Sequence, residues 1–229
     1  MRIVWRKLNN CIVQGAGKSC NGAVLNRGVT KEEITEILEA HNSYRAKIAQ
    51  GKEMEGRPGP QPGAANMHEL DWDPELAAIA QMHADQCQFE HDCSDCRKVD
   101  RFRVGQNLYI YKQTIRRAPV HWERAVGSWY EEVEVFSRRN VSPFQFTHET
   151  GHYSQLVWAD TTQVGCGATS FKEGQWFSTL YTCNYGPGSN IIRGEMYRQG
   201  QACSGCPAGT QCSLQYPGLC SKFAATIFT

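Results

Sequence analysis

The chain lacks a surplus of charge of either sign and has no long apolar run. Its 24 Lys and Arg side chains nearly balance its 23 Asp and Glu side chains. There is therefore no strong basic field to attract nucleic acid or an anionic membrane surface. No apolar run approaches the roughly 20 residues that a membrane-spanning helix needs. We expect neither a nucleic-acid partner nor a membrane span.

Cysteine, in contrast, is abundant. Eleven cysteines with irregular spacing lie among glycine and proline turns, a pattern that favours disulfides and an extracellular environment over metal clusters. Because eleven is odd, at least one thiol is free or pairs between chains. The 229 residues, 41% of them apolar, suffice for one well-packed domain with additions or for two small ones. The opening ten residues lack the apolar stretch of a secretion signal, so we expect a mature chain.

Apolar periodicity predicts three amphipathic helices. The first begins at a capping box on Thr30 and ends at Gly51. The second begins at Asp73, a carboxylate cap that is followed by proline. The third opens at Pro119 and carries Glu132 on its apolar stripe. A carboxylate in such a position indicates that this part of the helix faces something polar.

Alternating residues predict strands in the second half of the chain. One strand starts near Val104, and two more, 164–171 and 176–185, are joined around Gly174. After about Tyr197 the composition changes, because four cysteines fall within eighteen residues that contain few apolar side chains. Such a segment holds its shape only through cross-links.

The stretch HETGHYSQLVW, residues 148–158, begins with the His-Glu-x-x-His pattern of zinc peptidases. Those enzymes need both histidines on one helix and a third ligand further along. Here the predicted helix begins at about Gly151, which leaves His148 outside it. Gln155 and Trp158 stand where the extended pattern requires Gly and a third His. The pattern is therefore only weak evidence for a zinc peptidase.

From Gly151 onward, the same stretch resembles a signature of the CAP superfamily (cysteine-rich secretory, antigen 5 and pathogenesis-related proteins). GHYSQLVW matches that signature at every position. LYTCNYGPGSN at 180–190 resembles the second signature, with Ser189 as its one departure, and HNSYR at 41–45 fits a His-Asn-x-x-Arg helix. The likeness covers most of the chain and is greatest for the antigen 5 branch from insect venom and saliva.

The resemblance implies an α+β fold, a three-layer α-β-α sandwich with a small antiparallel sheet, rich in disulfides and followed by a short Cys-rich tail. With the change in composition, it predicts three segments. These are an N-terminal Cys-containing arm at 1–29, a CAP domain at 30–197 and a hinge-like tail at 198–229.

The resemblance also implies part of the disulfide pattern. Cys166 pairs with Cys183 across neighbouring strands, and the N-terminal arm is tied to the region from Cys87 to Cys96. We expect the tail to close on itself in two bonds, whose connectivity stays open. The odd thiol is then one of five cysteines: Cys11, Cys20, Cys87, Cys93 and Cys96.

Members of this family carry two histidines and two acidic residues in a cleft that often binds a divalent metal. By motif, the histidines are His91 and His152, and one acidic residue is Glu132. Gln106 occupies the second acidic position, so one orienting carboxylate and potential general base is missing. Imidazole ligation suits copper or zinc, neither of them obligatory. The alternative is that each imidazole is hydrogen-bonded to Glu132 or Gln106 and holds no metal.

Two further histidines lie on apolar helix faces. His41 belongs to the first predicted helix and His83 to the second. We predict that both are packed and hydrogen-bonded and that neither is a metal ligand.

The resemblance implies a secreted, non-enzymatic effector of arthropod saliva or venom that modulates host defence or haemostasis. Its cargo would be a small hydrophobic ligand (fatty acid, eicosanoid or sterol) in an apolar channel, a divalent metal at the two-His cleft, or both. Two alternatives stay open. One is copper-dependent removal of superoxide with an antiplatelet effect, and the other is antagonism of a host receptor or integrin. No Ser-His-acid or Cys-His set is visible as a nucleophilic centre.

Overall fold

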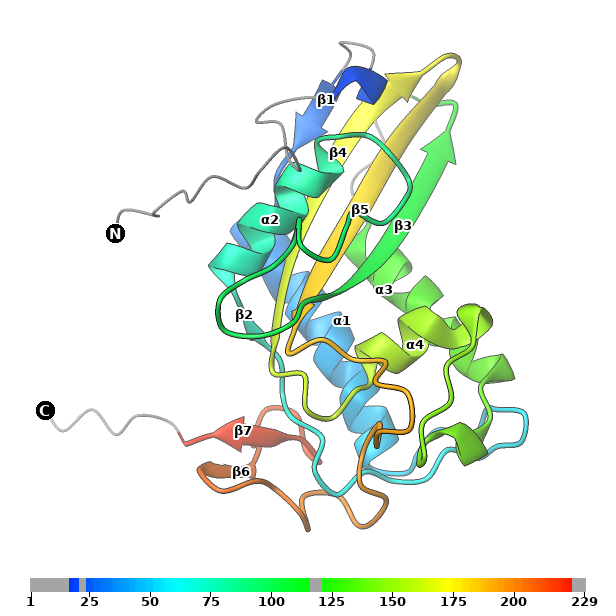
Figure 1. Cartoon of the computed structure of the whole chain (residues 1–229), viewed down its shortest axis with the longest axis vertical. Coiled ribbons are helices and arrows are strands. Elements are labelled where there is room, and N and C mark those ends of the chain that lie inside the picture. The colour runs from blue at the N-terminus through cyan, green and yellow to red at the C-terminus, as the bar shows by residue number, and fades with distance from the viewer. Residues whose placement is uncertain (1–16, 21–23, 116–120, 224–229) are drawn as a thin grey trace, which may run out of the picture.

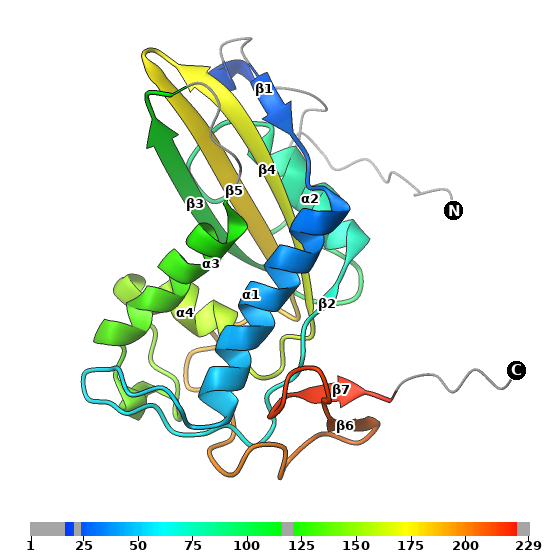
Figure 2. The ribbon, with the colours of Figure 1, turned by 180° about the vertical axis from the view of Figure 1, so that it is seen from behind.

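A central sheet separates two helical layers (Figures 1 and 2). On one face lies α2 (Pro74–Ala84), and on the other lie α1 (Lys31–Ala49) and α3 (Trp122–Glu131). This arrangement confirms the predicted three-layer sandwich. The computed structural model describes residues 17–20, 24–115 and 121–223.

The sheet has five strands, and its main path runs in the order β1-β4-β5-β3. The three long strands are β3 (Gly105–Gln113), β4 (Gln163–Glu173) and β5 (Trp176–Gly186), and the β4–β5 hairpin forms where it was predicted. Two short strands were not predicted. β1 (Val24–Arg27) is antiparallel to β4, and β2 (Asp71–Trp72) is parallel to it.

Local signals explain where the first two long helices start and stop. The Thr30 side chain accepts from the backbone of Glu33, whose carboxylate accepts from the backbone N–H of Thr30, so the capping box is complete. Beyond the helix, Gly51 has a φ of 64°, a conformation that glycine adopts without strain. At α2 the Asp73 carboxylate accepts from the backbone N–H of Leu76.

The third long helix begins at Trp122, and Pro119, its predicted start, lies outside the described residues. The fourth helix begins at Gly151, as predicted. This helix is α4 (Gly151–Leu156). The single turns of 3-10 helix are η1 (Lys18–Cys20), η2 (Glu132–Val135), η3 (Arg138–Asn140) and η4 (His148–Thr150).

Two glycines let α2 lie directly against β4. A Cβ atom on Gly165 would be 2.2 Å from the backbone nitrogen of Ala77, and one on Gly167 would be 2.4 Å from the backbone of Gln81. Any larger residue at either position would push helix and sheet apart. The main core lies on the other face of the sheet, and its large buried side chains include Trp122, Trp129, Tyr153, Trp158, Tyr181 and Tyr185.

Five disulfides join cysteines of the described chain. Two match the predicted pattern in the body, because Cys166 bonds to Cys183 and the arm is tied down by the bond from Cys20 to Cys87. Cys11 lies outside the described residues. The other three bonds are Cys93–Cys96 and, within the tail, Cys203–Cys212 and Cys206–Cys220.

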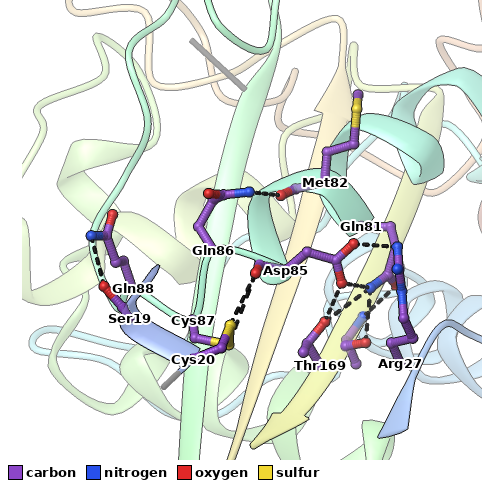
Figure 3. The surroundings of a disulfide bond; sticks show 11 residues. Ser19, Cys20, Arg27, Gln81, Met82, Asp85, Gln86, Cys87, Gln88 and Thr169 are labelled. Atoms are coloured by element: carbon purple, nitrogen blue, oxygen red, sulfur yellow. Dashed lines mark hydrogen bonds and ion pairs between the residues drawn. A yellow bond between two sulfur atoms is a disulfide. The ribbon is translucent and has the colours of Figure 1, made fainter. Parts of the chain in front are cut away.

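A buried carboxylate reinforces the arm bond (Figure 3). Asp85, two residues before Cys87, is bonded to the guanidinium of Arg27 in β1. It also accepts from the Thr169 hydroxyl at 2.7 Å and from the Gln81 amide at 2.9 Å. The arm is therefore fixed to α2 and β4 by polar contacts as well as by the Cys20–Cys87 disulfide.

The tail packs on the body of the molecule. Its hairpin consists of β6 (Thr210–Cys212) and β7 (Cys220–Lys222). The backbone N–H of Cys220 donates to the carbonyl of Met67 at 2.7 Å, and Leu219 is completely buried in the main core. The segment boundaries at 29 and 197 stay predictions. No helix of the described chain is long and apolar enough to cross a membrane.

Candidate functional site

His152 lies in the first turn of α4 and is held by Glu132 of η2. Its Nδ1 is 2.6 Å from Oε1 of Glu132, and Oε2 accepts from the backbone N–H groups of His152 (2.9 Å) and Tyr153 (3.0 Å). One carboxylate thus satisfies two free amides at the start of the helix and orients the imidazole. When the ring is in its neutral form, Nδ1 donates to Glu132 and Nε2 keeps a lone pair.

His91 lies in the loop after α2 and is held by Gln106 of β3. Its Nδ1 is 2.8 Å from Oε1 of Gln106, whose Nε2 donates to Oδ1 of Asn184 at 3.1 Å. Asn184 is itself oriented, because its Nδ2 donates to the carbonyl of Leu76 at 3.5 Å. The amide oxygen of Gln106 therefore faces His91, Nδ1 carries the proton and Nε2 carries the lone pair.

The two pairs are connected through consecutive residues of β3. Gln106 contacts His91, and Nδ2 of Asn107 donates to the backbone carbonyl of His152 at 3.0 Å. Over the described ranges, no group of three or more His, Cys, Asp and Glu side chains is placed to hold a metal ion. Each of the two imidazoles is oriented by a side-chain oxygen.

The chemistry of these donors fits a metal that accepts imidazole. Ligating histidines usually have one ring nitrogen bonded to an oxygen acceptor and the other directed to the metal. His91 and His152 both have Nδ1 bonded to a side-chain oxygen, and zinc and copper both accept neutral imidazole nitrogen. Water would complete the coordination of an ion that both rings bind.

His41 differs, because both of its ring nitrogens are used. Nδ1 donates to the carbonyl of Ile37 at 2.7 Å, and Nε2 accepts from the hydroxyl of Tyr185 at 2.9 Å. The side chain is completely buried, and burial lowers the pKa of His41 to about 4. The ring is thus neutral and has no free lone pair, which confirms that His41 is packed and hydrogen-bonded.

His83 is satisfied in the same way. Its Nε2 is 2.9 Å from the carbonyl of Glu90, to which it donates, and its Nδ1 is 2.9 Å from the hydroxyl of Thr182. Burial lowers the pKa of His83. Both nitrogens have hydrogen-bond partners, which confirms that His83 is packed and hydrogen-bonded.

The His-Asn-x-x-Arg motif stabilises the fold through hydrogen bonds to the backbone of other segments. Asn42 donates to the carbonyl of Leu70 and accepts from its N–H, at 3.1 and 2.8 Å. The buried Arg45 guanidinium donates to backbone carbonyls only, and burial lowers its pKa to about 9. Its acceptors are the carbonyl oxygens of His68, Leu156, Trp158, Ala159 and Thr161.

His148 does not join the site as a peptidase ligand would. It lies in η4, whereas His152 lies in α4, so the two histidines do not share one α-helix. The His148 ring packs edge-on against Phe146, with 5.3 Å between ring centroids. The arrangement that a His-Glu-x-x-His zinc peptidase requires is absent here.

Three polar residues behind the site were not predicted. Asn184 orients Gln106, and Asn107 contacts both the backbone of His152 and, at 3.4 Å, the hydroxyl of Tyr185. Asn184 and Tyr185 belong to the second signature stretch, CNYGP. A signal was therefore present in the sequence, but it did not reveal which histidine each residue supports.

These motifs, in this sandwich, define the class of protein. The chain belongs to the cysteine-rich secretory protein family (CAP), whose family model matches residues 38–185.

Among known proteins, the chain is similar to CRISP/Allergen/PR-1 of Trittame loki, with 45% identity over 89% of this chain and 51% of that protein. It is also similar to venom allergen 5 of Microctonus hyperodae, with 43% identity over 79% of this chain and 77% of that protein. The chain spans about half the length of the Trittame loki relative and of a cysteine-rich venom protein of Tityus serrulatus.

Solved structures agree with the fold. The crystal structure of NaASP2 with Zn²⁺ has a TM-score of 0.67 at 28% identity, over 85% of this chain and 97% of that one. The structure of BmVAL-1 has a TM-score of 0.71 at 24% identity, over 86% of this chain and 97% of that one, and supports the fold alone.

Proposed function

We propose that the protein is a secreted effector of the venom allergen 5 type that binds zinc or copper at His91 and His152. One observation carries the metal proposal. In both residues a side-chain oxygen holds Nδ1, which leaves the Nε2 lone pair available. Secretion is supported by the five disulfides and by the venom proteins among the relatives.

The two imidazoles are not equivalent ligands. His152 donates to a carboxylate, which makes its Nε2 more basic, whereas His91 donates to a neutral amide. We therefore expect His152 to be the stronger ligand. A bound ion would supply Lewis-acid chemistry or, as copper, redox chemistry. A solved relative supports the choice of zinc, because NaASP2 was crystallised with Zn²⁺.

Calorimetry with ZnCl₂ and CuCl₂ tests this assignment. We expect the unaltered protein to take up one ion per chain, and the double variant His91→Ala, His152→Ala to take up none. His148→Ala is the matched control, since it removes a nearby exposed imidazole that is not part of the site. Uptake that survives the double change, or is lost in the control, contradicts the proposal.

The other activities stay predictions with their own measurements. A fatty acid, eicosanoid or sterol would appear in native mass spectrometry of the purified protein and would remain in the double His variant. Superoxide removal would require copper and would be lost in that variant. Antagonism of a host receptor or integrin would persist without metal.

A further inference from the structure

We infer that a cavity between α1 and α3 binds a small organic cation, an ammonium group on an aromatic or aliphatic frame. The cavity has a volume of about 630 Å³, within the usual size range of small-molecule sites. Six of the residues that line the cavity matter for this inference: Glu36 and Tyr44 of α1, Tyr109 of β3, and Glu123, Arg124 and Glu131 of α3. None of them belongs to the two-His site.

The cavity carries a local excess of negative charge in a chain whose net charge is +1. Glu36, Glu123 and Glu131 line the cavity together with two basic side chains, His121 and Arg124. The guanidinium of Arg124 lies over the ring of Tyr111 at 4.5 Å. Throughout the described chain, no Lys, Arg or His lies within ion-pair distance of any of these three carboxylates. Carboxylates that line one cavity and have no ion-pair partner among the described residues favour a cationic ligand.

Tyr44 supplies an aromatic wall of the cavity. Burial raises the pKa of the Tyr44 hydroxyl most, and the nearby carboxylates of Glu123 and Glu131 raise it further. The Tyr44 ring stacks on Tyr130 with 4.0 Å between centroids, which holds its plane in place. An ammonium group is attracted both by carboxylates and by the faces of tyrosine rings.

Two other ligand classes fit less well. The three carboxylates lie around the cavity without converging, because no group of three metal-ligating side chains within the described residues is placed to hold one ion. A fatty acid would bring its own carboxylate toward three like charges. An extended organic cation can place its ammonium group near one or two of the acids and its frame against Tyr44 and Tyr109.

Three probes of one shape and different charge test the inference by calorimetry. Tryptamine is cationic, tryptophol is neutral and indole-3-propionate is anionic. We expect affinity in that order, with tryptamine binding weakened by added salt. In Glu36→Gln and Glu131→Gln, tryptamine affinity should fall about five- to tenfold each. Gln at 36 keeps an oxygen for the backbone N–H of Glu123, which Glu36 now accepts at 3.0 Å.

Matched controls separate this cavity from its surroundings. Glu134→Gln removes an exposed carboxylate of η2 that does not line the cavity, and should leave tryptamine affinity unchanged. The double variant His91→Ala, His152→Ala should also bind tryptamine normally. The inference is wrong if tryptamine shows no binding at millimolar concentration, if tryptophol binds equally well, or if both cavity variants bind like the unaltered protein. Displacement of tryptamine by submillimolar CaCl₂ would instead identify an inorganic cation site and overturn it.

Discussion

His41 and His83 differ from His91 and His152 in how many ring nitrogens are bonded. The first two are buried and use both nitrogens, and the second two use only Nδ1. A buried polar atom needs a hydrogen-bond partner, whereas an accessible lone pair on a ring nitrogen can stay unbonded and bind a ligand. Counting the bonds of each nitrogen therefore separates histidines that hold the fold from histidines that are able to bind metal.

The two sets of histidines are also connected. The Tyr185 hydroxyl lies 2.9 Å from Nε2 of His41 and 3.4 Å from the amide of Asn107, which in turn holds the backbone of His152. The ring of Trp129 contacts both His41 and His152, at centroid distances of 6.3 and 6.4 Å. The buried histidine thus helps to support the position of the accessible one.

The largest expected effect follows from removing His41. In His41→Ala, the hydroxyl of Tyr185 loses its acceptor and a cavity forms, so the free energy of unfolding should fall by about 3 kcal/mol. Urea unfolding measures this, and His148→Ala should change the value by less than about 0.5 kcal/mol. Metal stoichiometry of folded His41→Ala should stay that of the unaltered protein. A stable His41→Ala protein that no longer binds metal would reverse the roles given to these histidines.

Acid should destabilise the protein through the same residue. Because the pKa of His41 is lowered from 6.5 to about 4 in the folded state, the unfolded state binds more protons below pH 6.5. The stability that the neutral His41 contributes to the folded state is fully present above pH 6.5. It is lost as the pH falls toward 4, and the total loss is about 3 kcal/mol. Urea unfolding between pH 7.5 and 4.5 should show a shallower decline in His41→Gln. An equal decline in both proteins would assign the effect to other groups.

A smaller effect is expected from the carboxylate behind His152. Glu132→Gln removes the charge that makes the imidazole basic and puts an amide donor near two backbone N–H groups. Zinc affinity should fall about 10- to 100-fold by calorimetry, and the free energy of unfolding by about 1 kcal/mol. Unchanged zinc affinity would show that Glu132 serves only to cap α4.

The smallest effect is expected from restoring the missing carboxylate. Gln106→Glu gives His91 a charged partner in place of a neutral one, and zinc affinity should rise by a few-fold, at most about tenfold. Calorimetry in parallel with Gln113→Glu, which adds the same charge at the far end of β3, distinguishes a local effect from net charge. An equal rise in both variants would mean that the position of the carboxylate does not matter.

Signals that act within a few residues were readable from the sequence. Thr30 caps its helix through its immediate neighbours, and the β4–β5 hairpin forms around Gly174, so both were predicted correctly. The four residues of β1 and the two of β2 are too short to show a period, and they become strands only because β4 offers them an edge.

Polar contacts between distant segments could not be derived in this way. The pairing of His152 with Glu132 was anticipated only through family motifs and the odd position of a carboxylate on an apolar stripe. The carbonyl oxygens that accept hydrogen bonds from Arg45 come from separate segments of the chain. The acidic cavity exists only because α1 and α3 pack side by side. No periodicity in the sequence records those distances.

The central claim is that His91 and His152 carry free Nε2 lone pairs whereas His41 and His83 do not. Long-range ¹H–¹⁵N spectra of the histidine rings during a ZnCl₂ titration test it most directly. We predict Nδ1–H tautomers for His91 and His152, with Nε2 resonances that shift as zinc is added, while the resonances of His41 and His83 stay fixed. Zinc-dependent shifts at His41, His83 or His148, with His91 and His152 unmoved, would contradict the account.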